Sequence, residues 1–98
     1  MNINEGKIVF NYLKNKHGND REAYIAYDKL DIKNKKTILK NIIISYLVDY
    51  YWNNTLLFDG VNLSPEKRRY RIVEYSVHQY KKMNSEEREI IIEKILNN

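Results

Sequence analysis

The stretch from Thr37 to Trp52 is the most apolar segment of the chain, and its polar residues recur with a helical period. On a helix that turns by about 100° per residue, the side chains of Asn41, Ser45 and Asp49 fall in one narrow stripe. The other positions are almost all aliphatic or aromatic and cover an arc of roughly 240°. A helix that is apolar over so much of its surface is normally enclosed by its own protein. The pattern therefore predicts a central helix over residues 32–53.

Shorter amphipathic segments flank this helix, and most begin or end at a recognisable signal. Gly18 is well placed to end the first segment, and Ser64-Pro65-Glu66 is typical of a helix start. Asn19 and Asn84, each followed three residues later by glutamate, have the spacing of a reciprocal cap. The predicted helices are 4–16, 20–30, 32–53, 64–83 and 84–97.

Each predicted helix has an apolar face that we expect to be buried. In the first helix that face excludes Phe10. The expected faces are Ile8, Val9, Tyr12 and Leu13; Tyr24, Tyr27 and Leu30; Tyr70, Val73, Val77 and Tyr80, widened by Ile72 and Met83; and Ile91, Ile92, Ile95 and Leu96. The connection before Ser64 contains an Asp59-Gly60 turn, and its apolar residues 56–58 are expected to pack back on the core. Together these features predict an all-α fold, a small single-domain bundle of about five helices spanning residues 1–98.

Composition narrows the class of protein. The 98 residues include no cysteine, which excludes disulfides and thiol chemistry, and 43% are hydrophobic, which argues against disorder. The longest apolar run, Ile42–Val48, is far shorter than the ~20 residues that span a bilayer, and no signal-peptide pattern follows Met1. We therefore expect a soluble, cytoplasmic protein with no membrane partner. The bias toward Asn, Ile, Lys and Tyr is typical of an AT-rich genome, such as that of a low-GC bacterium, its phages or its plasmids.

The placement of charge is the most informative feature for function. Acidic residues stabilise a helix N-terminus, and cations there oppose the helix dipole by about 0.3–1 kcal/mol each. The second and fifth predicted helices begin with acids, whereas the third and fourth begin with lysines and arginines. The cations concerned are Lys33, Lys35, Lys36, Lys40, Lys67, Arg68, Arg69 and Arg71. Folding does not explain this arrangement, but an anionic partner would, and the net charge of +4 is compatible with one.

The polar arc of the fourth helix strengthens this interpretation. It carries six basic side chains with Tyr75 among them and Glu74 as its one acid. A basic face that contains an aromatic side chain is typical of contacts with nucleic acid or acidic protein. The predicted partner-binding residues are Lys33, Lys35, Lys36, Lys67, Arg68, Arg71, Tyr75, His78 and Lys82. The alternative is a solvated face in a lysine-rich protein. Arg69 lies on the apolar side, where we expect it either to extend to the helix end or to pair with an acid such as Asp49.

No catalytic, metal or cofactor signature is present in the sequence. His17 and Asp20 have a spacing that two metal ligands could use, but a third and a fourth ligand are missing. The three glycines form no phosphate-binding loop, and the serines lack the spacing of a nucleophile elbow. We therefore expect a protein that is not an enzyme and that needs no metal or other cofactor.

Three hypotheses about function remain. The first is a small binding or regulatory protein that docks on an anionic protein or nucleoprotein and modulates or inhibits it. Its size and composition are typical of phage or plasmid accessory proteins such as inhibitors of host defence. The second is direct DNA or RNA binding by a helix-turn-helix-like pair over 20–53, with Lys33, Lys35 and Lys36 at the leading end. The third is a helical bundle similar to bacteriocin-immunity proteins. The sequence leaves the oligomeric state open.

Overall fold

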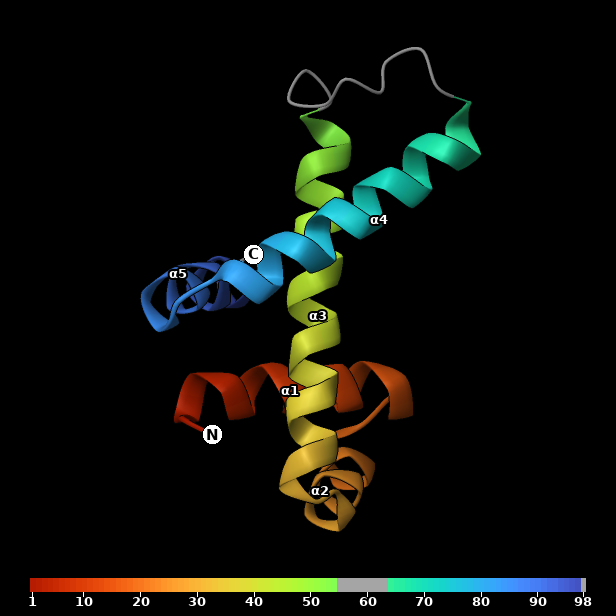
Figure 1. Cartoon of the computed structure of the whole chain (residues 1–98). Coiled ribbons are helices and arrows are strands. Elements are labelled where there is room, and N and C mark those ends of the chain that lie inside the picture. Colours follow the sequence, from red (N-terminus) through yellow and green to blue (C-terminus); the bar gives the residue numbers. More distant parts are fainter. Residues whose placement is uncertain (55–63, 98) are drawn as a thin grey trace.

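The structure is a computed structural model that describes residues 1–54 and 64–97, and within these ranges it is helical with no strand (Figure 1). The helices are α1 (Ile3–His17), α2 (Asp20–Lys29), α3 (Ile32–Asn53), α4 (Pro65–Lys82) and α5 (Ser85–Leu96). The predicted all-α bundle of five helices is confirmed, and every boundary lies within one residue of its predicted position. The predicted turn at Asp59-Gly60 and the packing of residues 56–58 lie outside the described residues.

Local side-chain chemistry fixes where these helices begin and end. The side chains of Asn19, Asp31, Ser64 and Asn84 all accept a hydrogen bond from the backbone N–H three residues later, as N-caps do. The reciprocal cap is complete at Asn84, where Glu87 returns a bond to the cap backbone, and only the first half forms at Asn19. Gly18 ends α1 with a φ of 86°, a left-handed conformation that glycine adopts without strain.

The core forms where four of the helices meet. α1 packs against α2, α3 and α5, and α3 also packs against α4 and α5. The buried residues of this core are Ile8, Val9, Leu13, Ala23, Leu39, Ile43, Leu47, Ile91 and Ile92. In α3 the fully buried residues follow a single line four positions apart, and the neighbouring apolar residues are only partly buried. α3 is therefore covered less completely than its apolar arc predicts.

α4 has two parts with different surroundings. Its C-terminal end reaches the core through Tyr80, followed by Met83. Its earlier buried residues, Ile72 and Ser76, lie outside that core cluster, on the side that packs against α3. The first turns of α4 and the last turns of α3 thus form a two-helix arm that extends away from α1 and α5 (Figure 1). The molecule is accordingly elongated, 47 Å by 28 Å by 24 Å.

The predicted apolar face of α4 is wrong in its centre. Tyr70 is 68% exposed and Val73 is 40% exposed, whereas Ile72 and Ser76 are buried. The polar residue Ser76 is tolerated there because its hydroxyl donates to the carbonyl of Ile72 at 2.7 Å. The prediction was wrong because it ranked the tyrosines as more apolar than Ser76. A serine can be buried in a helix because its hydroxyl forms a hydrogen bond within the same helix.

The pairing of α1 with α2 brings a second correction. Phe10, which the pattern placed off the apolar face, lies 4.7 Å from Tyr24 and 6.4 Å from Tyr27 between ring centroids. Tyr12 and Tyr24, both expected to be buried, are exposed. Ala23 is the buried residue of α2. A small residue at this position permits close approach of two helices, and the large aromatic rings then close the edge of the contact.

Candidate functional site

Most of the basic residues of α4, but not Arg68 and Arg69, lie on the side of the helix opposite its contact with α3. At 100° per residue, Lys67, Arg71 and His78 fall within about 40° of one another, on the far side from Ile72 and Ser76. All five basic positions on this side are exposed: Lys67, Arg71, His78, Lys81 and Lys82. We call these five residues the basic face. From Lys67 to Lys82 the basic face extends for about 22 Å at the helical rise of ~1.5 Å per residue.

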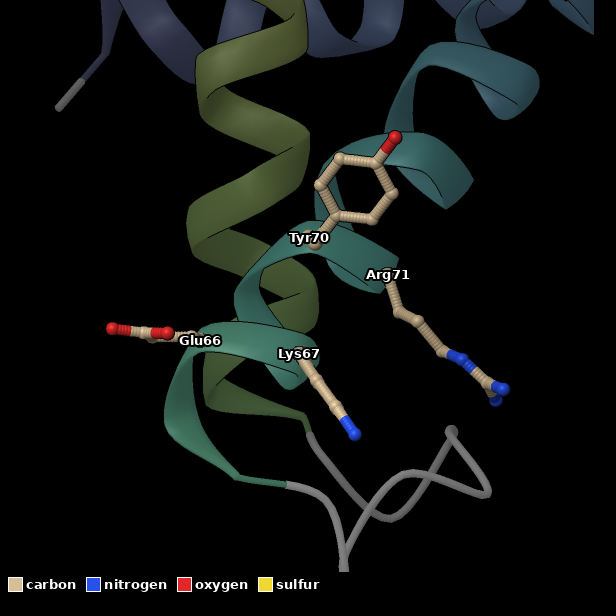
Figure 2. A pocket seen from close by; sticks show the side chains of 4 residues that line it. All are labelled: Glu66, Lys67, Tyr70 and Arg71. Carbon is tan, nitrogen blue, oxygen red and sulfur yellow. The ribbon is translucent and has the colours of Figure 1, made fainter.

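The start of the basic face is separated from the one acid of the first turn. Figure 2 shows Lys67 and Arg71 pointing to the same side of α4, while Glu66 points away from them. These residues and the exposed Tyr70 line an open pocket of about 430 Å³. Two cations and an aromatic ring are therefore presented together at the outer end of the two-helix arm.

None of the described carboxylates lies within ion-pair distance of these basic side chains. Across residues 1–54 and 64–97 the structure has one ion pair, between Lys14 Nζ and Asp20 Oδ1 at 3.1 Å. The suggested pair of Arg69 with Asp49 is therefore absent, and Arg69 is exposed. The concentration of positive charge at the start of α4 is thus not offset by ion pairs among the described residues.

Two of the eight lysines and arginines that oppose the helix dipoles of α3 and α4 have a structural role. Arg68 lies over the ring of Trp52, 4.7 Å from its centroid, and Lys35 lies 3.9 Å from the ring centroid of Tyr27. A cation–π contact at an accessible site contributes about 0.5–1 kcal/mol, which is similar to the dipole cost of the same cation. The positions of Arg68 and Lys35 near the helix starts are therefore explained without an anionic partner.

The structure divides the predicted partner-binding residues between two places. Lys33, Lys35 and Lys36 lie in the first turns of α3, near α2 (Figure 1), whereas Arg68 in the first turns of α4 contacts Trp52 in the last turn of α3. Lys36 and Trp52 are about 24 Å apart along α3, from 16 residues at ~1.5 Å each. The outer end of the basic face therefore lies far from the lysines at the start of α3, so the basic face of α4 is the more coherent candidate.

Aromatic side chains join α3 to α4 beside the basic face. Tyr51 packs edge-on against Tyr75 of α4 at 4.9 Å and against Tyr50 at 5.4 Å. Burial raises the pKa of Tyr51 above 10.0, with smaller contributions from Tyr75 and Tyr50. Trp52, the last residue of the apolar stretch that predicts the central helix, is 39% exposed. Tyr75 is therefore part of the helix contact as well as an exposed neighbour of the cations.

Sequence reasoning missed Arg88, a cation in the acidic first turn of α5. Its guanidinium lies over Tyr80, 5.0 Å from the ring centroid, and its Nε is buried without a hydrogen-bond partner among the described residues. An unpaired buried donor costs about 1–3 kcal/mol. The sequence offered one indication, a single arginine among the glutamates at the N-terminus of α5. This arginine opposes the helix dipole of α5 as Lys67 opposes that of α4.

Features of other protein classes are absent from residues 1–54 and 64–97. These residues contain no cluster of three or more His, Asp or Glu side chains that could bind a metal ion. No helix within the same ranges combines the length and apolar character needed to cross a membrane. The fold defines the class as a small all-α bundle. Beyond that class, no family model, curated protein or solved structure matches this chain.

Proposed function

We propose that this chain is a non-enzymatic binding protein that docks through the basic face of α4 on a macromolecular partner with an anionic surface, and modulates or inhibits that partner. The observation that carries the proposal is the basic face itself: four exposed lysines and arginines together with His78, on the side of α4 that does not pack against α3. Its size and composition fit an accessory protein of a phage or plasmid, of the kind that inhibits host defence.

The cost to folding supports a binding role over a merely solvated surface. Solvation alone favours charged residues of either sign, so it gives no reason to place Lys67 and Arg71 within the first two turns of α4. At Lys67, in the first turn, glutamate or aspartate would stabilise the helix and the cation costs about 0.3–1 kcal/mol, an effect that falls off toward Arg71. A partner that supplies negative charge removes this cost on binding and also pairs with the side chains.

The helix-turn-helix alternative has less support from the fold. A recognition helix must present one long side to a DNA groove. In α3 the residues Leu39, Ile43 and Leu47 are buried, and Lys35 is held over Tyr27. The exposed cations of α4 offer a surface for phosphate contacts without any such helix entering a groove.

The test compares two charge-reversal variants with the same change in net charge. Lys67→Glu with Arg71→Glu reverses the outer end of the basic face and leaves the Arg68–Trp52 contact intact. Lys7→Glu with Lys40→Glu reverses two cations that are exposed on α1 and α3. Binding of each variant and of the parent chain to a random-sequence DNA duplex and to polyglutamate is measured by fluorescence anisotropy over a salt series.

We expect the α4 double variant to lose at least tenfold in affinity for whichever probe binds, and the α1/α3 double variant to lose much less. For the duplex, the slope of log affinity against log salt is expected to fall by roughly 0.9 for each phosphate contact removed. Equal losses in the two variants would mean that net charge, and not the basic face, governs binding. If neither probe binds the parent chain at low salt, the proposal of an anionic partner fails.

A further inference from the structure

A second candidate site lies on the other side of the molecule from the outer end of the arm, where α1, α3, α4 and α5 meet. It is a cavity of about 450 Å³, within the range of ~300–1,000 Å³ that is usual for small-molecule sites. Its lining includes the apolar and aromatic residues Leu39, Ile43 and Tyr80 and the charged residues Glu5, Lys36 and Arg88. None of these polar residues belongs to the basic face, so the cavity is independent of the proposed function.

Arg88 gives the cavity its chemical character. The guanidinium is held against the ring of Tyr80, which leaves its planar edge as the group available for hydrogen bonding. Its Nε is a buried donor without a partner among the described residues. A guanidinium has donors and no acceptor, and its fork matches a carboxylate or a phosphate. Lys36, from α3, adds a second donor-only cation to the same wall.

The acids near the cavity are engaged at the start of α1. Glu5 Oε1 accepts from the backbone N–H of Asn2 at 3.0 Å, and Glu89 Oε1 accepts from Asn2 Nδ2 at 2.7 Å. Neither acid lies within ion-pair distance of Arg88 or Lys36, since the one ion pair of the described residues is on α1 and α2. The lining thus has two cations against one carboxylate that already caps a helix.

We infer that this cavity binds a small organic anion, a carboxylate or phosphate ester attached to an apolar or aromatic group. The anionic end accepts hydrogen bonds from Arg88 and Lys36, and the apolar end packs on Leu39, Ile43 and Tyr80. Because Arg88 comes from α5 and Lys36 from α3, the ligand bridges two helices that otherwise make few direct contacts. It binds only the folded chain and therefore raises the thermal stability of the protein.

The test uses three probes that separate the two ends of the ligand. Phenyl phosphate has both the anion and the ring, inorganic phosphate has the anion alone, and benzyl alcohol has the ring alone. Binding is measured by isothermal titration calorimetry, and the melting temperature by circular dichroism. We expect phenyl phosphate to bind saturably, at least tenfold more tightly than either single-feature probe, and to raise the melting temperature.

Variants then assign the site to its residues. Arg88→Lys keeps the charge but removes the guanidinium fork, and Lys36→Gln removes the second cation; each is expected to weaken phenyl phosphate binding about tenfold. Lys94→Gln, an exposed position of α5 outside the cavity, is the matched control and is expected to leave the affinity unchanged. Binding that Lys94→Gln weakens as much as Arg88→Lys, equal binding of benzyl alcohol, or no saturable binding of phenyl phosphate would each overturn the inference.

Discussion

α4 and α5 begin with the same cap geometry but with opposite charges. In α5 the N-cap Asn84 accepts from the backbone N–H of Glu87 at 2.9 Å, and the Glu87 side chain completes the box. In α4 the N-cap Ser64 accepts from the backbone N–H of Lys67 at 3.4 Å, and a lysine occupies the position where a box requires glutamate or glutamine. The start of α5 follows what helix stability requires, whereas the start of α4 departs from it in favour of exposed positive charge.

The same two helices differ in what they bury. α5 contributes Ile91 and Ile92 to the core, and Ile92 is 1% exposed. α4 contributes Ile72 and Ser76 to its own contact with α3, outside that core. α5 is therefore part of the core, whereas α4 packs along α3, reaches the core at Tyr80 and Met83, and leaves its basic face exposed. The comparison associates stability with α5 and the proposed binding with α4.

The largest expected effect comes from truncating one buried residue in each helix. Ile92→Ala removes side-chain atoms from the centre of the bundle, where neighbours on α1 and α3 cannot close the space, and we expect a loss of about 2–5 kcal/mol. Ile72→Ala acts on a contact between two helices that can move together, so its loss is expected near the lower end, about 2 kcal/mol. The free energy of unfolding is measured by urea denaturation followed by circular dichroism.

An equal or larger loss for Ile72→Ala would contradict the division of the molecule into a core and an arm. The slope of the urea transition provides the control, because an unchanged slope shows that both variants unfold from a native state of similar compactness.

The next effect is smaller and has opposite signs in the two helices. Lys67→Glu restores an acid and a potential capping box to α4, so we expect a gain in stability of about 0.3–1 kcal/mol together with weaker binding to the anionic probes. The converse substitution, Glu87→Lys, breaks the box in α5 and is expected to lose at least as much stability without weakening that binding. Stability is measured by urea denaturation, and binding by anisotropy. A destabilising Lys67→Glu would show that Lys67 is there for folding.

The fold followed from local signals that act within a few residues. The caps at Asn19, Asp31, Ser64 and Asn84 and the glycine at 18 fixed the helix ends within one residue. These signals are readable from sequence because a cap and its acceptor are three positions apart. Burial was harder to predict for the aromatic residues, since Tyr24 and Tyr70 are amphipathic and remain exposed at the edges of helix contacts.

The candidate sites were predictable only in part. The cations of α4 share one helical side, so periodicity alone brought Lys67, Arg71 and His78 together. Periodicity gave no information on the distance between the starts of α3 and α4, which depends on how the two helices cross. Arg88 was missed for the same reason: its importance comes from Lys36 and Tyr80, which belong to other helices and reach the same cavity through tertiary packing.

The smallest expected effect is on the pH dependence of stability. It arises because the contact between α4 and α3 contains ionisable tyrosines, whereas the contact of α5 with the core is aliphatic. The pKa of Tyr51 is raised above 10.0 by burial and by the neighbouring Tyr75 and Tyr50, so the folded chain holds this proton more tightly than the unfolded chain. Its contribution to stability is therefore complete below about pH 10 and is lost as the pH rises through the folded pKa. Between about pH 8 and about pH 11, Tyr51→Phe is expected to lose less stability than the parent chain.

Tyr12→Phe, at an exposed position of α1 outside the tyrosine cluster, controls for loss of a hydroxyl and should follow the parent. The comparison uses the change of unfolding free energy with pH in each of the three proteins. If Tyr51→Phe and the parent lose the same stability, deprotonation of the α3–α4 contact has no part in alkaline unfolding.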